Sequence, residues 1–357
     1  MVEGRSASAP EGRKDSAAGK LAAIVRWYLR EVWGRHEGPG VLPFYCDPER
    51  VGHFAVAPRD LETGDDEALF RLFVALAMFQ ARRDVVIMRQ QHSLPARVAG
   101  SLASLRSIAR KARASPCQML RTAEAFDSGC TVRKVGDSSD CLQRPGAACH
   151  VKDAAVAFNR MADLGKLPTS AWLQVWRDGG LPRMVREVVT AEPDPRVRAE
   201  LLVAHLSMVR RVGRKLATMF VSTLSVPYLA PGLTPWYPRI DGNELVVVDT
   251  NVLRGVRVLR RSSTPICYDD CARWLRSKAR RIDLRDLCAG LPRYSPRIVQ
   301  QALYSFGSRS NRIARRDSCL RRHLPCADCV PGLCPVLRTR VGSTSGALQR
   351  GRGAFCP

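Results

Sequence analysis

Four cysteines near the C-terminus have spacings that suit a metal centre. Cys319, Cys326, Cys329 and Cys334 are separated by six, two and four residues. Four thiolates in one short segment can bind either a [4Fe–4S] cluster or a structural zinc ion. The spacing alone favours neither, so it predicts a metal site and leaves the metal open.

A second group of thiols lies in the middle of the chain, next to a histidine. Its members are Cys117, Cys130, Cys141, Cys149 and His150. Their intervals match no familiar metal-binding pattern, so we expect scattered thiols, with an additional zinc site as the alternative. Cys267 and Cys271 are one helical turn apart and are expected to face the core.

Residues 204–224 have the pattern of two helices joined by a short basic turn. The first helix is expected to end near Val209 and the second to begin at Arg214, after Gly213. Such a turn can direct the backbone N–H groups of the second helix at a phosphate. The basic residues around the turn are Arg210, Arg211, Arg214 and Lys215. Taken alone, the segment predicts only a basic helix-turn-helix.

Asp249 follows the apolar residues 246–248 and precedes a helical pattern over about 250–260. An aspartate at the start of a helix accepts hydrogen bonds from the first-turn amides, so Asp249 is a natural N-cap. On its own, this position indicates a cap and nothing more.

The charge of the chain is strongly basic. Lys and Arg total 57 against 33 acidic residues, a formal net charge of +24. Such a surplus indicates a polyanionic partner, and nucleic acid is the usual one; a merely solvated basic surface is the alternative. Residues 69–79 are too short to span a membrane, and residues 1–20 lack the apolar centre of a secretory signal. We therefore expect a cytoplasmic protein, nucleoid-associated if bacterial, whose cysteines bind metal before they form disulfides.

Apolar residues recur at helical spacing along most of the chain, which predicts a mainly α fold. We expect a disordered segment at 1–20, irregular structure at 126–150 and a connector at 225–243. Helices are expected at 21–32, 67–91, 97–113, 153–164, 169–177, 182–190, 197–209, 250–260, 268–277, 283–289 and 296–306.

Two motifs acquire a specific meaning when they are read together. VGRKLA at 212–217 and VVVDTNVLR at 246–254 resemble the helix-hairpin-helix DNA glycosylases of the endonuclease III branch. The hairpin of that family reads like LPGVGRKTA and its aspartate motif like VDTHVxR, so Asn251 replaces the usual histidine. ALAMFQA at 75–81 resembles the helix end that carries a glutamine wedge in the family. The resemblance covers about 67–91, 198–224, 246–256 and 296–335.

The resemblance implies that Lys215 and Asp249 are catalytic, in base-excision repair with glycosylase and AP-lyase activity. A glycosylase must extrude its target base, and a carboxylate then stabilises the positive charge that develops on the sugar. Neighbouring cations favour the neutral, nucleophilic form of a lysine amine, and attack at the sugar carbon would give a Schiff base. The DNA-binding residues implied by the hairpin, the glutamine wedge and the aspartate motif are Gln80, Arg210, Arg211, Val212, Gly213, Arg214 and Arg254.

The resemblance also favours the [4Fe–4S] cluster over zinc, because that branch ends in a similar four-cysteine loop. Its final interval is typically one residue longer than the interval here. The expected partner is double-stranded DNA with a lesion or an abasic site, bound by a monomer, with an oxidised pyrimidine as the default damaged base. The rival hypothesis is a non-catalytic DNA-binding or damage-sensing protein that retains the fold.

The implied fold has two lobes with a DNA cleft between them. A helical-barrel lobe would comprise 67–243, with the helix-hairpin-helix at 198–224 and an unmatched insertion at about 110–195. A cluster lobe would comprise 21–66 plus 244–335, followed by a basic tail at 336–357. Two departures stand out. Arg211 occupies the position of the first hairpin glycine, and the interval from Lys215 to Asp249 is longer than in the family. Within this interval, Trp236 and Tyr237 either line the base pocket or pack on the surface.

Overall fold

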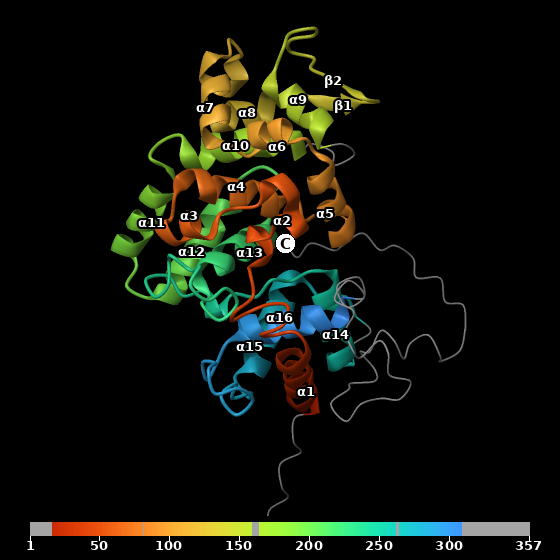
Figure 1. Ribbon diagram of the computed structural model, residues 1–357, viewed down its shortest axis with the longest axis vertical. Helices are drawn as coiled ribbons and strands as arrows, with labels where there is room; N and C mark the ends of the chain where they lie inside the picture. Colours follow the sequence, from red (N-terminus) through yellow and green to blue (C-terminus); the bar gives the residue numbers. More distant parts are fainter. Residues whose placement is uncertain (1–15, 81, 159–163, 262–263, 309–357) are drawn as a thin grey trace, which may run out of the picture.

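The computed structural model describes residues 16–80, 82–158, 164–261 and 264–308, whose arrangement is shown in Figure 1. Helices make up most of this part of the chain. Its strands are β1 (Arg133–Val135) and β2 (Ser138–Asp140), which pair in an antiparallel hairpin with Lys134 opposite Ser139. The prediction of a mainly α fold is confirmed.

Buried apolar side chains form two cores, and the larger one, here the first core, joins residues from Cys46 to Leu245. Its α-helices in chain order are α2 (Pro48–Val51), α3 (Pro58–Thr63), α4 (Asp66–Ala77), α5 (Asp84–Ser93), α6 (Ala96–Leu102), α7 (Leu105–Ala114), α8 (Ala123–Gly129), α9 (His150–Ala157), α10 (Leu167–Ala171), α11 (Gly180–Ala191), α12 (Pro195–Leu206) and α13 (Arg214–Ser225). Short turns of helix add η1 (Phe44–Cys46), η2 (Gly52–Phe54), η3 (Gln118–Leu120), η4 (Leu164–Lys166), η5 (Trp172–Trp176) and η6 (Gly242–Glu244). Nearly every residue of α4 is buried, so this helix forms the centre of the first core.

The second core combines the start of the described chain with its end. Its helices are α1 (Ser16–Glu31), α14 (Thr250–Arg260), α15 (Tyr268–Ala279) and α16 (Pro296–Gly307). The chain leaves this core after α1 and returns to it at Val246. In Figure 1, α1 and α14–α16 lie at the lower end, below the helices of the first core.

Several expected elements differ from those observed. Residues 16–20 belong to α1, whereas we expected disorder through residue 20; residues 1–15 lie outside the described part. The helix expected at 67–91 is divided into α4 and α5, and the one expected at 97–113 into α6 and α7, where the Ser104 hydroxyl caps the new helix at the Ser107 N–H (3.1 Å). Residues 283–289 form turns instead of a helix.

The segment from Cys46 to Leu61 packs in the first core, whereas we had assigned residues 21–66 to the same unit as 244–335. The apolar side chains Val51, Phe54 and Leu61 are fully or almost fully buried there, next to the helices that follow them in the chain. Only α1 of the N-terminal region therefore belongs to the second core. The chain passes from the second core to the first between Val32 and Cys46, and it returns to the second core at residues 245–246.

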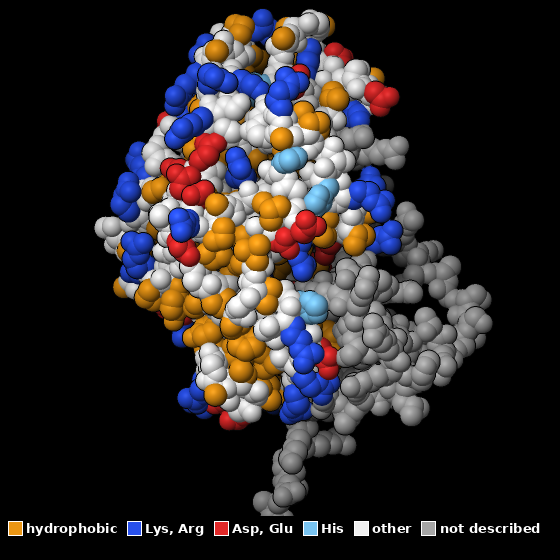
Figure 2. All heavy atoms as spheres, in the orientation of Figure 1, with side chains coloured by type: hydrophobic (Ala, Val, Ile, Leu, Met, Phe, Trp, Pro, Cys, Tyr) orange, Lys and Arg blue, Asp and Glu red, His pale blue; other side chains and the backbone are white. Residues whose placement is uncertain are grey.

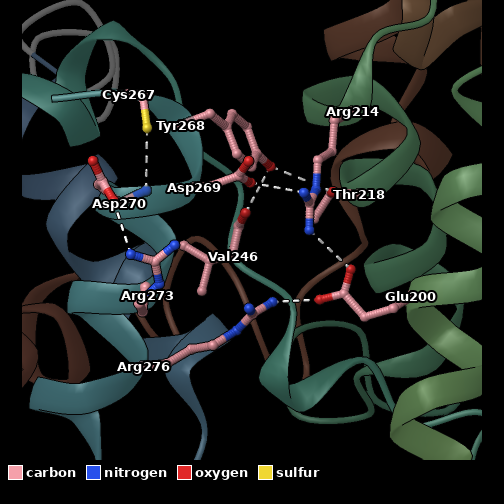
Figure 3. A network of polar contacts seen from close by, with 10 residues as sticks. All are labelled: Glu200, Arg214, Thr218, Val246, Cys267, Tyr268, Asp269, Asp270, Arg273 and Arg276. Carbon is pink, nitrogen blue, oxygen red and sulfur yellow. Dashed lines mark hydrogen bonds and ion pairs between the residues drawn. The ribbon is translucent and has the colours of Figure 1, made fainter. Parts of the chain in front are cut away.

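Polar contacts join the two cores at one side, as Figure 3 shows. The Arg214 guanidinium on α13 pairs with Glu200 of α12 (3.2 Å) and with Asp269 of α15 (2.7 Å). Glu200 also pairs with Arg276 of α15. Because Arg214 and Glu200 each have two partners, the four side chains form a network rather than isolated surface pairs.

Replacing Glu200 by Gln is expected to lower the free energy of unfolding by about 0.5–1 kcal/mol, because two arginines lose a shared carboxylate. Urea denaturation in low salt and in 1 M salt measures this, and salt should reduce the effect. Glu187→Gln is the matched control, since it breaks only the exposed pair with Arg183 (2.7 Å). Equal effects of the two substitutions would contradict the network.

Candidate functional site

A cavity of about 210 Å³ lies between the two cores, and residues of both line it. Its lining residues include Phe44, Tyr45, Phe79, Asp84, Lys215, Leu229, Ala230, Asp249, Arg297, Gln300, Gln301 and Tyr304. Lys215 comes from α13 and Asp249 from the residue before α14. The fold thus brings these two residues to one cavity, although they are far apart in the chain.

Lys215 is the second residue of α13 and is half-buried. Its Nζ donates a hydrogen bond to the backbone carbonyl of Phe79 (3.1 Å). Phe79 lies in the break between α4 and α5, where its carbonyl is free of the helical hydrogen-bond ladder. The division of the expected 67–91 helix therefore has a local consequence, because it supplies the acceptor that positions the lysine.

Asp249 is the N-cap of α14, as the sequence predicts. Its Oδ1 accepts a hydrogen bond from the Val252 N–H (2.8 Å), and the Asn251 amide lies 3.5 Å from Oδ2. Burial raises the pKa of Asp249, while the Val252 N–H and the charge of Lys215 act in the opposite direction. The cap fixes the carboxylate, and Lys215 lines the same cavity.

The turn between α12 and α13 has an unusual backbone. Arg211 has φ +67°, in the left-handed region that favours glycine. This is the position at which the resembling family has its first hairpin glycine, so the arginine adopts the backbone that a glycine would adopt there. Gly213 is the N-cap of α13 and provides no side-chain cap, which leaves the first amides of that helix without an intrahelical acceptor.

Side chains and backbone groups of α8, α10 and η5 contact this turn. The Arg210 N–H donates to the Ser170 hydroxyl (3.0 Å), and its Nη1 donates to the Asp127 carbonyl (2.5 Å). The Gln174 amide donates both to the Asp127 carboxylate (2.6 Å) and to the Met208 carbonyl (3.1 Å). Asp127, Ser170 and Gln174 lie in α8, α10 and η5, so residues that we could not assign from the sequence anchor the turn.

These contacts change the expected set of DNA-binding residues. The Arg210 guanidinium is held by the Asp127 carbonyl, and that of Arg214 by two carboxylates. The Val212 side chain is buried, and its N–H donates to the Val209 carbonyl (2.9 Å). All three residues are thus engaged within the protein.

The other expected DNA-binding residues remain accessible in different degrees. Arg211, Gly213 and Arg254 are exposed. Gln80 is half-buried just after α4, where its Nε2 donates to the Ala77 carbonyl (2.6 Å). It is one residue from the carbonyl that Lys215 contacts, so this helix end lies at the edge of the site.

The cysteines proposed as metal ligands, Cys319, Cys326, Cys329 and Cys334, lie outside the described residues. Within the described ranges, no three His, Cys, Asp or Glu side chains are arranged to hold a metal, and this includes the central group around Cys130 and His150. Cys271 faces the second core as expected, and burial raises its pKa to about 12. Cys267 instead caps α15.

The sequence predicts that Trp236 and Tyr237, in the connector before Asp249, either line the base pocket or pack on the surface. Trp236 is buried against Phe220, with ring centroids 5.9 Å apart, and Tyr237 is exposed. Neither lines the cavity, whereas Leu229 and Ala230 of the same connector do.

Sequence reasoning missed the polar residues of α16. The Tyr304 hydroxyl donates to the carboxylate of Asp84, the first residue of α5, and so joins the two cores across the cavity. Burial lowers the pKa of the Arg297 guanidinium to about 10. The only sequence signal was the presence of Arg297, Gln300 and Gln301 within an otherwise apolar helix.

Comparison with protein-family models, with curated proteins and with solved structures gives no significant match. A search of the described helices for an apolar stretch long enough to cross a membrane finds none.

Replacing Asp249 by Asn is expected to raise the free energy of unfolding at pH 7. Asn caps a helix about as well as Asp, and it removes a buried charge. The folded-state pKa of Asp249 lies above its unfolded value, so ionisation at neutral pH weakens folding. The gain should shrink as the pH falls through the folded pKa, where the wild-type carboxyl takes up a proton.

Urea denaturation at pH 7 and near pH 4 measures this difference. Asp65→Asn is the matched control, because Asp65 caps α4 through the Ala68 N–H (2.9 Å) but is exposed. It should give no such gain, since an exposed carboxylate at a helix N-terminus is favourable. A loss of stability for Asp249→Asn at neutral pH would contradict the assignment.

Proposed function

We propose that this protein is a base-excision DNA repair glycosylase with AP-lyase activity. The proposal is carried by one observation: a lysine amine and a helix-capping aspartate line the same cavity between two cores. The hairpin that precedes the lysine and the cap that holds the aspartate are the two motifs of the endonuclease III resemblance. The two cores with the cavity between them would then be the two lobes of that fold.

In the proposed reaction the damaged base is extruded from the duplex into the cavity. The bond between the base and C1′ of the sugar breaks, the departing base takes up a proton, and the Asp249 carboxylate stabilises the positive charge on the sugar. The neutral amine of Lys215 bonds to C1′. One N–H proton then passes to the ring oxygen as the C1′–O4′ bond breaks, which leaves a protonated imine. Loss of a C2′ proton then expels the 3′ phosphate and nicks the strand.

DNA binding would use the net charge of the chain and the exposed start of α13. Figure 2 shows Lys and Arg side chains over the upper part and the edges of the visible face, and apolar side chains gathered in its lower middle. The surplus of cations would supply the phosphate contacts. The backbone amides of Arg214 and Lys215, with Arg211 and Arg254, are the candidate contacts of a monomer on double-stranded DNA. Gln80 would fill the gap that the extruded base leaves.

A [4Fe–4S] cluster on Cys319, Cys326, Cys329 and Cys334 is part of the proposal, with structural zinc as the alternative. The donor set fits either group, because four thiolates bind both. The first of these cysteines follows the end of α16 by twelve residues. The group would organise the chain after α16, and no step of the proposed reaction passes through it.

A non-catalytic DNA-binding or damage-sensing protein is the second candidate. It is favoured by the turn at Arg211, where a side chain occupies a left-handed backbone position. It is also favoured by the carboxylate partners of Arg214, which direct that cation away from a phosphate.

Borohydride reduction in the presence of abasic-site DNA should trap the wild-type protein covalently, because reduction fixes the imine to Lys215. Lys215→Gln should abolish trapping, and Asp249→Asn should slow it by about 10²–10³-fold through loss of charge stabilisation. Lys152→Gln is the matched control, since Lys152 also donates to backbone carbonyls (3.1 Å each) but lies away from the cavity. DNA binding by the wild type without trapping would support the second candidate instead.

The purified protein should be brown and contain about four irons per chain. Elemental analysis and the visible absorption spectrum measure this, and Cys329→Ser should lower the iron content. Cys117→Ser should leave it unchanged, because Cys117 lies in the central group. Stoichiometric zinc in place of iron would refute the cluster and favour the alternative metal.

A further inference from the structure

One wall of the cavity is formed by a buried arginine that is held entirely by neutral groups. Arg297 is 8% exposed. Its Nε donates to the Ser222 hydroxyl (3.0 Å), and its Nη1 donates to the side-chain carbonyls of Gln300 and Gln301 (2.9 Å each). These three acceptors determine the orientation of the guanidinium plane, and none of them neutralises its charge.

The neighbouring amide of Gln300 is also held in one orientation. Its Oε1 accepts from Arg297 and from the Val247 N–H (3.3 Å). Both partners are donors, so the oxygen must face them and the Nε2 group must point the other way. The amide of Gln301 has its own partner, because its Nε2 donates to Glu37 (3.0 Å).

Two donors therefore remain unused at this wall. Among the described residues, Arg297 Nη2 and Gln300 Nε2 have no hydrogen-bond acceptor. Both atoms retain some accessible surface. Both residues line the cavity, so the accessible donor atoms face it. Donor atoms that face the cavity without an acceptor in the protein can bind acceptor atoms of a ligand there.

We propose that Arg297 and Gln300 select extruded bases by the carbonyl oxygen at C4, which they bind with two N–H donors. This inference rests on the proposed glycosylase function and names the chemistry that its pocket reads. A carbonyl oxygen can accept a hydrogen bond from each donor. An exocyclic amino group is itself a donor, so it would place its N–H groups next to those of Arg297 and Gln300 without an acceptor. Sites built to hydrogen-bond one group reject analogues that lack it far more strongly than apolar pockets do.

The rest of the cavity suits the same ligand. Phe44, Tyr45 and Phe79 pack edge to face, with centroids 5.0–6.1 Å apart, and supply apolar walls for a planar ring. Lys215 and Asp249 line the same space, where the sugar carbon would be attacked. Arg297 keeps its positive charge at neutral pH, because burial lowers its pKa only to about 10. The cation therefore strengthens a bond to a carbonyl oxygen.

The test uses two duplexes whose bases share the C2 carbonyl and differ at the C4 edge. 5-Hydroxyuracil has a C4 carbonyl beside N3–H, and 5-hydroxycytosine has a C4 amino group beside an unprotonated N3. Single-turnover base release by the wild type should be faster from 5-hydroxyuracil by roughly ten- to hundredfold, the range for a hydrogen bond to a charged group. Arg297→Met should remove most of this preference. Borohydride trapping at an abasic site, which contains no base, provides the reference rate for each variant.

Controls separate base reading from folding. Gln300→Met should reduce the preference, and Gln91→Met should keep it, because Gln91 is equally buried but lies in the first core away from the cavity. Arg297→Lys retains the positive charge but lacks the planar guanidinium. It replaces Arg297→Met in the test if that variant melts at a lower temperature.

Each remaining outcome counts against a specific idea. A wild type that traps abasic DNA but shows no carbonyl preference overturns the role of Arg297. Equal losses of trapping and base release in Arg297→Met also overturn it, because they indicate a structural role. Absence of trapping by the wild type defeats the proposed function itself.

Discussion

The capping of α14 by the Asp249 carboxylate is the interaction on which the site depends. It occurs where the chain passes from the first core to the second, directly after the buried residues Val246 and Val248. The first-turn amides of α14 fix the position of the carboxylate, while burial opposes its ionisation. The charge of Lys215, in the first turn of α13, partly offsets this effect of burial on the pKa of Asp249. This arrangement is useful for chemistry because a backbone carbonyl positions the Lys215 amine and a backbone N–H positions the Asp249 carboxylate, so neither group needs the other for its position.

The two cores meet through polar side chains on both sides of the cavity. On one side Arg214 bridges Glu200 and Asp269, and on the other Tyr304 of α16 reaches Asp84 of α5. An apolar interface would gain stability by closing the space between the cores. Polar contacts with fixed directions hold the cores in place at a few points and leave a cavity between them. The arrangement therefore keeps a cavity between the cores. In return, charged and hydroxyl groups are buried, and each of them needs a hydrogen-bond partner.

Contacts from α8, α10 and η5 explain how Arg211 keeps a left-handed backbone in the turn between α12 and α13. A left-handed backbone at a residue with a side chain costs about 1–3 kcal/mol and persists only where surrounding contacts determine it. Ser170, Asp127 and Gln174 provide such contacts, because they bind the turn at Arg210 and Met208. These contacts and the unusual turn are thus parts of one structural solution.

Local signals in the sequence were sufficient for Asp249, whose cap follows from its neighbours, and for helices such as 250–260, which is observed as α14. They were insufficient for Arg297 and Asp84, because their roles arise from contacts with residues far away in the chain, Ser222 and Tyr304. The partners of the cations also come from distant residues. Arg210 and Arg214 are predicted phosphate contacts, and in the structure the Asp127 carbonyl binds Arg210 while carboxylates from α12 and α15 bind Arg214. Sequence spacing identifies which charges are near the site, and only the tertiary partners decide which of them face a ligand.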